Sequence, residues 1–365
     1  VKMLGLDNLR QQLHRRLHLL AAGPADAPHR HSTMRNAIAW SYDLLSGEEQ
    51  RVFRQLAVCV GGCTLDAALV LASHRSPNEP VSQADMINAE PDLSTLDSMA
   101  TLVDHSLLTV TPGIDGAMRY GMLETIREFG VLHLSPDELK IANTTHARIF
   151  LDLAWRHRPL VTTRATFAPM NVLAADLENI RAALDWLEHA ELDTEFARLV
   201  IATYIFMFTC GHFAEGSAWL RRAQARMAGL PPLERALLQV AVAEHLMVNG
   251  EHGAATIEFA AVMPLVRAAG TPLDLANALI SSGVAHVYNG EYAAGEAHLR
   301  EALSLADLMP DSQVQAAIAS RAQANLSVAA RAQGHLDAAA GWGEAALQRC
   351  RAAGLELAEA RILID

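Results

Sequence analysis

Three groups of residues in this sequence have types and spacings that suit chemistry at a binding site. The segment "HRH", residues 29–31, brings two imidazoles and a guanidinium to the start of a helical pattern, where N–H donors favour an anion. Cys59 and Cys63 lie on either side of "VGG" and offer two soft ligands for a metal ion. His14 and His18 are four residues apart, so a helix would present both on one face.

Each group also has an interpretation without chemistry. A structural zinc site needs about four ligands, and no second C-x-x-C or H-x-x-x-H pair accompanies the cysteines. We therefore expect two buried thiols and no metal, and a solvated basic helix face at the paired histidines. His29 fits an ordinary linker histidine, whereas both interpretations stay open for Arg30 and His31. With no G-x-S-x-G elbow and no paired carboxylates, we expect that this chain is not an enzyme.

The composition favours helices that pack through small residues. At 365 residues the chain is long enough for two or three domains, and 51% of it is hydrophobic, which gives each domain a core. Aromatic residues make up only 5%, which favours an α-rich over a β-rich fold. The net charge of −12 argues against nucleic acid as a general partner, because Lys and Arg supply the affinity for phosphates.

We expect no targeting signal in this sequence. No apolar run approaches the roughly 20 residues of a membrane-spanning helix, and no charged-then-apolar leader with a cleavage site opens the chain. The four cysteines are sparse, as is typical of a reducing compartment, so we expect a cytoplasmic location. The chain opens on the basic amphipathic segment "VKMLGLDNLRQQLHRRLHLL", which leads us to expect a fragment of a larger protein.

A run of short helices followed by two strands occupies residues 28–134. Ser32 or Thr33 is expected to cap the first helix, and Ser46 with Glu49 forms a capping box for the second. A Gly-rich tip separates the two strands. The helices are predicted over 34–45, 46–58, 64–72, 92–106 and 124–134, and the strands over 107–110 and 118–123. This order predicts a winged helix-turn-helix domain with a small β-hairpin.

The rest of the chain is predicted to be helical. A connector over 135–195 starts with a helix over 136–158 that ends before Pro159. Over 196–365 a glycine recurs at intervals of 39, 40 and 44 residues, at Gly211, Gly250, Gly290 and Gly334. The residue five positions after each glycine is Gly or Ala, and the residue twelve positions after it is Ala or Val. Each glycine is therefore expected to make the turn between two closely packed antiparallel helices.

These units resemble the tetratricopeptide repeat, most clearly in "ALISSGVAHVYNGEYAAGEAHLREAL". The predicted fold is thus mostly α: a winged helix-turn-helix domain with a small β-hairpin, followed by an α-helical superhelix of tetratricopeptide-like repeats.

The N-terminal half resembles one protein family. The segments "RHSTMRNAIAWSYDLLSGEEQRVFRQLAVCVGGCTLDAA", "LVDHSLL" and "RYGMLETIREFG" are similar to bacterial STAND regulatory ATPases, the signal-transduction NTPases found in transcriptional regulators of the AfsR and MalT-like kinds. The segments "LAADLENIRAALDWLEHA" and "GHFAEGSAWLRRA" resemble the same group. The resemblance therefore runs from residue 1 to about residue 230.

The resemblance implies parts that this chain lacks. Full-length members place a P-loop ATPase module before the winged helix and a superhelical sensor after it, and many add a DNA-binding domain at one end. No G-x-x-x-x-G-K-[ST] occurs here, so ATP or ADP is expected in the full-length parent and no cofactor in this chain. Residues 1–27 are then expected to be a remnant of the helical lid of the NTPase module.

Related STAND proteins end the winged helix with a Met-His-Asp motif whose histidine contacts ADP. Met122-Leu123-Glu124 looks like the equivalent turn, with Leu123 in place of the histidine. The resemblance therefore implies that Arg30, His31, Leu123 and Glu124 face the nucleotide. Because Leu123 has no imidazole, we expect its turn to pack against the core and not to sense phosphate.

Superhelical repeats expose a concave surface that suits a peptide, a protein or a small effector. The aromatic candidates for partner contact are Tyr204, Phe208, Trp219, Tyr288 and Tyr292. The leading hypothesis is a sensor whose ligand changes how the winged helix packs on the NTPase core. Under this hypothesis the parent protein could form an oligomer when it is activated.

Two alternatives are a winged helix that reads DNA directly and a repeat scaffold for oligomerisation. Residues 28–130 contain seven Arg or Lys against thirteen Asp or Glu, a balance of −6, which is the wrong sign for a surface that follows phosphates. The helix in the recognition position, 64–72, has no Arg, Asn or Gln to read a base. We therefore expect no direct nucleic-acid binding by this part of the parent.

Overall fold

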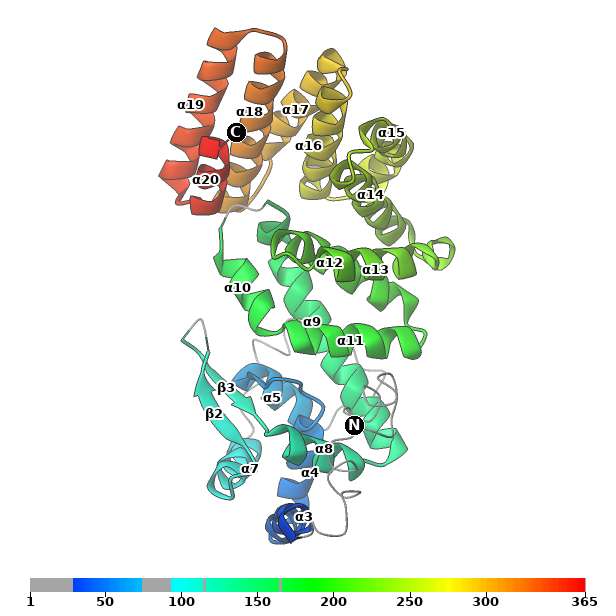
Figure 1. Cartoon of the computed structure of the whole chain (residues 1–365), viewed down its shortest axis with the longest axis vertical. Helices are drawn as coiled ribbons and strands as arrows, with labels where there is room; N and C mark the ends of the chain where they lie inside the picture. The colour runs from blue at the N-terminus through cyan, green and yellow to red at the C-terminus, as the bar shows by residue number, and fades with distance from the viewer. Residues whose placement is uncertain (1–28, 74–92, 114–115, 164–165, 365) are drawn as a thin grey trace. The chain divides into compact units, whose positions relative to one another are not determined.

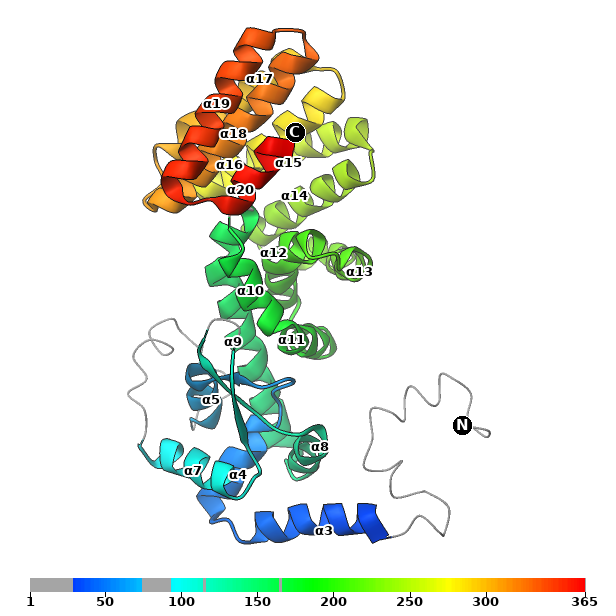
Figure 2. The same cartoon turned by 60° about the vertical axis from the view of Figure 1, so that its left-hand side comes forward.

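The computed structural model of the chain describes residues 29–73, 93–113, 116–163 and 166–364. The predicted lid remnant, 1–27, lies outside these residues. The chain divides into two compact units (Figure 1 and Figure 2). The first unit comprises Val1–Phe150 with Ala175–Trp186, and the second comprises Leu151–Ala174 with Leu187–Asp365.

The helices of the first unit follow its capping signals. In α4 (Gly47–Leu56), Ser46 Oγ accepts the N–H of Glu49 at 3.3 Å, and the Glu49 carboxylate accepts the N–H of Ser46 at 2.7 Å. The Thr64 hydroxyl caps α5 (Leu65–Ala72) by accepting the N–H of Ala67. The unit also contains α3 (His29–Asp43), α7 (Leu93–Asp104), α8 (Glu124–Leu132) and the first parts of α9 (Pro136–Thr163) and α11 (Leu177–His189).

Aromatic rings from three helices form the core of this unit. The ring centroid of Tyr42 lies 5.4 Å from that of Phe53 and 5.6 Å from that of Phe129. A Cβ at Gly130 would lie 2.6 Å from the Cβ of Ala57, so α8 approaches the end of α4 more closely than any larger residue would permit. This packing holds the second half of α8 against the end of α4.

The small sheet has three antiparallel strands in the order β1-β3-β2. β2 (Thr109–Pro112) and β3 (Met118–Gly121) form the predicted hairpin, with Val110 opposite Tyr120. The third strand, β1 (Cys63–Thr64), pairs with the other edge of β3 and was not predicted from the sequence. It depends on Gly62, whose φ is +83° and whose added Cβ would lie 2.9 Å from the carbonyl oxygen of Tyr120.

Two predicted helix ends are wrong. α3 begins at His29, so Ser32 and Thr33 lie inside the helix and do not cap it. α9 continues through Pro159 to Thr163. A proline removes one backbone N–H from a helix, but α9 continues beyond it for one more turn. In that turn the Thr162 hydroxyl donates to Arg158 O at 2.9 Å and the Thr163 hydroxyl donates to Leu160 O at 2.7 Å.

The second unit is a row of helix pairs. It opens with the end of α9 and with α10 (Ala168–Ala175), of which residues up to Ala174 belong to this unit, and it ends with α20 (Glu356–Ile364). The four pairs are α12 (Asp193–Thr209) with α13 (Phe213–Gln224), α14 (Pro232–Val248) with α15 (His252–Ala269), α16 (Pro272–Tyr288) with α17 (Tyr292–Ala306), and α18 (Ser312–Ala332) with α19 (Leu336–Ala353). A short 3₁₀ helix, Met227–Gly229, follows α13. The predicted fold class is confirmed.

The recurring glycines make the turns of these four pairs, as predicted. Their φ values lie between +80° and +83°, in the left-handed region that glycine enters without strain, at Gly211, Gly250, Gly290 and Gly334. The small residues after them are buried where the paired helices meet. A Cβ at Gly295 would lie 2.8 Å from Cγ2 of Val287 and 2.9 Å from the carbonyl oxygen of Gly283. The paired helices α16 and α17 therefore need glycine at this crossing.

One hydrophobic core runs through consecutive repeats. Its buried members come from α14 to α18 and include Phe259, Leu279, Leu299 and Ile318, all with no exposed surface. Each pair buries its apolar face against the next, as in other repeat folds. Within the described part of the chain, no helix is both long and apolar enough to cross a membrane.

Candidate functional site

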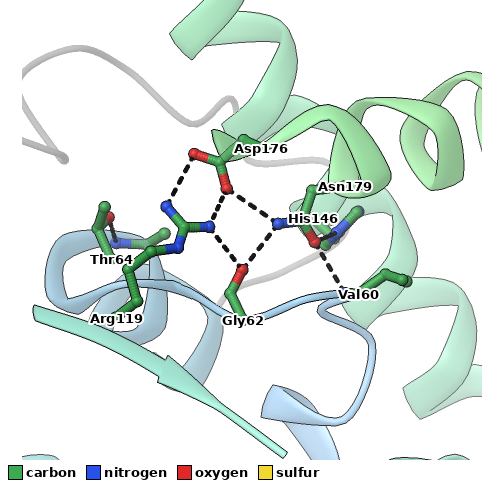
Figure 3. A network of polar contacts seen from close by, with 8 residues as sticks. Val60, Gly62, Thr64, Arg119, His146, Asp176 and Asn179 are labelled. Atoms are coloured by element: carbon green, nitrogen blue, oxygen red, sulfur yellow. Dashed lines mark hydrogen bonds and ion pairs between the residues drawn. The ribbon is translucent and has the colours of Figure 1, made fainter. Parts of the chain in front are cut away.

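A buried polar network joins the small sheet of the first unit to the start of α11 (Figure 3). Arg119 of β3 contacts Asp176 twice, with Nη2–Oδ1 at 2.5 Å and Nη1–Oδ2 at 3.4 Å. The same Nη2 donates to the carbonyl oxygen of Gly62 at 3.0 Å. Asp176 is only 3% exposed, so water screens this ion pair little.

Asn179 is the centre of the network and is completely buried. Its Nδ2 donates to Gly62 O at 2.8 Å and to Asp176 Oδ1 at 3.0 Å. Its Oδ1 accepts the N–H of Val60 at 2.8 Å and lies 3.1 Å from His146 Nε2. Every hydrogen-bonding position of the amide is therefore used.

His146 completes this arrangement as a neutral imidazole. Asn179 Oδ1 can only accept, so His146 must carry its proton on Nε2. Burial lowers the pKa of His146 to about 4, and the hydrogen bond that His146 donates to Asn179 opposes this only in part. The side chains of Arg119, His146, Asp176 and Asn179, which we call the β3–α11 network, thus connect β3, α9 and the start of α11.

The β3–α11 network holds the strand that leads into the predicted nucleotide-facing turn. Leu123, just after β3, is 57% exposed. The Glu124 carboxylate accepts hydrogen bonds from Arg127 at 2.9 and 3.1 Å, and Arg127 also donates to Ala57 O at 3.2 Å. A nucleotide-facing role for Leu123 and Glu124 stays a prediction.

The other predicted nucleotide-facing residues, Arg30 and His31, lie in the first turn of α3. Their side chains are outside the described part of the structure. A nucleotide-facing role for these two residues therefore stays a prediction.

The two cysteines that could offer soft metal ligands lie in the core of the first unit. Cys59 and Cys63 are buried free thiols. A hydrogen bond with Cys63, together with burial, raises the pKa of the Cys59 thiol well above its ordinary value, which makes it a poor metal ligand. The described residues contain no cluster of three or more His, Cys, Asp or Glu side chains that could hold a metal ion.

The second unit contains a cavity of about 340 Å³, lined mainly by the first helix of each pair, which we call the inner helix, together with α20 and the start of α15. We call it the inner cavity. Because the helices α12, α14, α16, α18 and α20 each contribute to it, it extends over all four repeats. Its lining consists of Tyr204, Phe208, Glu244, Met247, Val248, His252, Ser281, Val284, Tyr288, Arg321, Asn325 and Arg361.

Three of the five aromatic candidates lie in this lining: Tyr204, Phe208 and Tyr288. Trp219 lies on the buried face of α13 and is 4% exposed, and Tyr292 is half-buried at the start of α17. Neither contributes to the inner cavity. The three candidates that line the cavity therefore lie on the first helix of a pair, whereas Trp219 and Tyr292 lie on the second helix of a pair.

A chain of hydrogen bonds crosses the cavity lining. Ser281 Oγ donates to Glu244 Oε1 at 2.6 Å and accepts from Arg321 Nη2 at 3.3 Å. Arg321 Nη1 also donates to Asn277 Oδ1 at 2.8 Å and to Thr162 O at 3.2 Å. Arg321 therefore connects α18 to α16 and to the end of α9.

Aromatic and aliphatic side chains form the rest of the lining. The Tyr288 ring is 63% exposed, and the His252 ring stacks on it with centroids 5.1 Å apart and planes 20° apart. His252 Nδ1 is buried and has no hydrogen-bond partner among the described residues. Val248, at 39% exposed, adds to this open apolar surface. The inner cavity thus combines flat apolar walls with a few polar groups, as ligand sites do.

A buried ion pair joins α16, which lines the inner cavity, to α9. Asp274, 4% exposed, accepts from Arg158 Nη2 at 2.7 Å and from the Thr271 hydroxyl at 2.7 Å. Burial by itself would raise the pKa of Asp274, but Arg158 and the hydrogen bonds from Thr271 outweigh it and lower that pKa. The start of α16 is thereby fixed against the end of α9.

Comparison with known proteins agrees with this architecture. No family model matches the chain. Two relatives, from Mycobacterium tuberculosis and Mycobacterium bovis, are each described as a "Putative HTH-type transcriptional regulator", and each is 29% identical over 309 residues, which covers 80% of this chain. In fold, the chain is similar to a STAND protein with a tetratricopeptide repeat sensor from Pyrococcus horikoshii, at a TM-score of 0.51, 13% identity and 88% coverage of this chain.

The resemblance to the STAND regulators is confirmed. The chain spans 32% of the length of the mycobacterial relatives and 47% of the Pyrococcus chain. The structural likeness, at 13% identity, concerns the fold. What the sequence similarity adds is homology to transcriptional regulators.

Sequence reasoning missed the polar residues of both sites. Ser281, Arg321 and Arg361 line the inner cavity from three helices, and no motif connects them in the sequence. Asn179 contacts Val60 across 119 positions. The only sequence signal near Asn179 was its place within "LAADLENIRAALDWLEHA", which carries the family resemblance.

Proposed function

We propose that this chain is the regulatory and sensor region of a STAND-type ATPase that regulates transcription. In this proposal the repeats bind an effector in the inner cavity, and the winged helix packs on the nucleotide-binding core of the parent. The inner cavity carries the proposal, because its lining comes from all four repeats and from α20, so that a change in how the repeats stack would alter its shape.

Exposed apolar side chains support the packing role of the winged helix. Trp40 is 67% exposed on α3, and Leu123 is 57% exposed at the start of α8. Large exposed apolar side chains suit a surface that another domain covers. ATP or ADP would then bind to the core of the parent, and this chain, without a P-loop, would not hydrolyse it.

The effector would act by a shift in population. A ligand that binds one arrangement of the repeats more tightly favours that arrangement by its difference in affinity. Two helices, α9 and α11, contribute residues to both units. We propose that they transmit the change to the winged helix through the β3–α11 network.

The test uses the full-length parent with a blocked cavity. Val248→Trp places an indole in the inner cavity at a position that is already 39% exposed. Ile257→Trp adds the same indole on α15, at a position that is 71% exposed and does not line the cavity. We expect Val248→Trp, but not Ile257→Trp, to change nucleotide exchange and reporter transcription. Equal behaviour of both variants and the unmodified parent would remove the sensor proposal.

Direct DNA reading by this winged helix is the less favoured function. The relatives are named HTH-type regulators, but this chain spans only 32% of their length. Binding of this chain to duplex DNA that falls steeply with added salt would favour DNA reading. The absence of binding at low salt would exclude it.

A further inference from the structure

Two histidines of the third helix pair lie side by side in the second unit. His286 is on α16 and His298 is on α17, and their ring centroids are 5.3 Å apart with the ring planes at 67°. Both side chains are half-buried. Each histidine lies three positions after one of the two glycines, Gly283 and Gly295, at which the helices cross in close contact. The rigid crossing therefore fixes the distance between the two imidazoles.

Each imidazole has one nitrogen engaged and the other free. His286 Nδ1 lies 2.5 Å from Oε2 of Glu291, and His298 Nδ1 lies 3.1 Å from Oγ of Ser282. Within the described ranges, neither Nε2 has a hydrogen-bond partner. A carboxylate accepts a proton and a hydroxyl can do so, which lets both rings keep a lone pair on Nε2. Metal-ligating histidines show this arrangement, with their second nitrogen bonded to an oxygen of the protein.

The two Nδ1 contacts leave the space between the rings open. Glu291 follows the end of α16, whereas Ser282 lies one turn before His286. The two Nδ1 atoms are therefore turned towards opposite ends of the pair, and neither contact lies between the imidazoles. The rings can then offer their other nitrogens to one ion.

The surroundings suit a neutral imidazole that binds a cation. Burial lowers the pKa of His298, and the neighbouring His286 lowers it further, so His298 keeps its lone pair at neutral pH. The charge of Arg267, which also acts on His298, is paired with that of Glu301. The Glu291 carboxylate then remains to balance part of the charge of a bound cation.

We propose that His286 and His298 bind one Zn²⁺ ion through their Nε2 atoms, with water completing an open tetrahedral site between α16 and α17. With Zn–N bonds of about 2.1 Å, a tetrahedral ion holds two imidazole centroids about 5.2 Å apart, which agrees with the observed 5.3 Å. A square-planar ion such as Cu²⁺ would hold them about 4.5 Å apart as neighbouring ligands or about 6.4 Å apart as opposite ligands. The separation therefore favours Zn²⁺. This site is independent of the proposed sensor function.

Titration of the metal-free full chain with ZnCl₂ tests the site by calorimetry. His286→Gln and His298→Gln should each weaken zinc binding at least about tenfold, because each removes one of the two protein ligands. His14 and His18 could also meet on one helix face. The His14→Gln/His18→Gln double variant is therefore the matched control and should keep the site. Zinc affinity and stoichiometry unchanged by His286→Gln and His298→Gln would overturn the inference.

A variant that keeps both rings separates metal binding from folding. Glu291 is exposed in the turn between the helices, so Glu291→Ala should leave the circular dichroism spectrum unchanged. It should still weaken zinc binding about tenfold, because it removes the partner that orients His286. Unchanged affinity in this variant would refute the assigned geometry.

Cobalt reports on the coordination. Co²⁺ added in place of zinc should give the intense visible bands of a tetrahedral ion, and His298→Gln should abolish them. The weak bands of an octahedral ion, or the same spectrum in both chains, would refute a shared tetrahedral site.

Discussion

Replacing Asn179 with alanine is the sharpest test of the β3–α11 network. The substitution removes all four hydrogen bonds of the amide. Gly62 O keeps its bond from Arg119, and Asp176 keeps its ion pair with Arg119. The Val60 N–H and the His146 Nε2–H lose the partner that the structure gives them.

The magnitude follows from these two orphaned donors. A buried polar group left without a partner costs about 1–3 kcal/mol. Two of them predict that Asn179→Ala lowers the free energy of unfolding of the first unit by about 2–6 kcal/mol. This is a large part of the stability of a typical domain.

The assay is urea-dependent hydrogen exchange, resolved by peptide. Peptides covering 57–64 and 124–132 report on the first unit, and a peptide covering 255–266 reports on the second. We expect protection to fall in the first two and to stay constant in the third. Asn36→Ala, at an exposed position of α3, is the matched control and should have almost no effect. A loss below about 0.5 kcal/mol for Asn179→Ala, the range of surface substitutions, would refute the network as a stabilising element.

Asn179→Asp distinguishes lost donors from lost volume. The carboxylate still accepts from Val60 and His146, but it cannot donate to Gly62 O and it adds a second negative charge beside Asp176. We expect a destabilisation similar to that of Asn179→Ala and a raised His146 pKa, measured by NMR titration of the ring. A stable Asn179→Asp variant would contradict this account.

Three further predictions concern single residues. The pKa of His146 is about 4 in the folded state and 6.5 as its ordinary value, so between these pH values the unfolded chain binds more protons than the folded chain. The free energy of unfolding of the first unit should therefore fall by about 3 kcal/mol from pH 7 to pH 4. Urea titrations at several pH values measure this, and a His146→Gln variant with the same pH dependence would contradict it. Gly295→Ala should lower the melting temperature measured by calorimetry, because its new methyl group clashes with Val287 at a cost of about 1–3 kcal/mol. Gly341→Ala, which has open space around it, should leave the melting temperature unchanged or raise it. Equal melting temperatures for the two variants would count against close packing at Gly295. Asp274→Asn should cost about 3–5 kcal/mol because Arg158 stays buried without its anion, and a chemical denaturation midpoint unchanged from that of the unmodified chain would exclude this role for the pair.

Local signals in the sequence predicted most of the helices because their causes are local. The capping box at Ser46 and the cap at Thr64 act within one turn and appear in the structure as expected. Two helix boundaries without such a signal, the start of α3 and the end of α9, differ from the prediction. α9 continues through Pro159 to Thr163 although a proline removes one backbone hydrogen bond from a helix interior.

The binding candidates show the limit of residue type as a criterion. Tyr288 and Trp219 are both large aromatic residues in the repeats, yet Tyr288 is 63% exposed in the inner cavity and Trp219 is 4% exposed in a core. The difference is which helix of a pair carries each residue and which face it presents. Composition alone does not contain that information.

By itself the sequence determined the repeat architecture, since each turn needs only one glycine with positive φ and small residues at fixed distances from it. The family resemblance came from the sequence in the same way. The tertiary structure alone decided the two sites. The β3–α11 network and the polarity of the inner cavity depend on side chains from distant segments, such as Val60 with Asn179 and Phe208 with Arg361. Hydrogen bonds and burial act over a few ångströms, so only folding brings such residues within reach of one another.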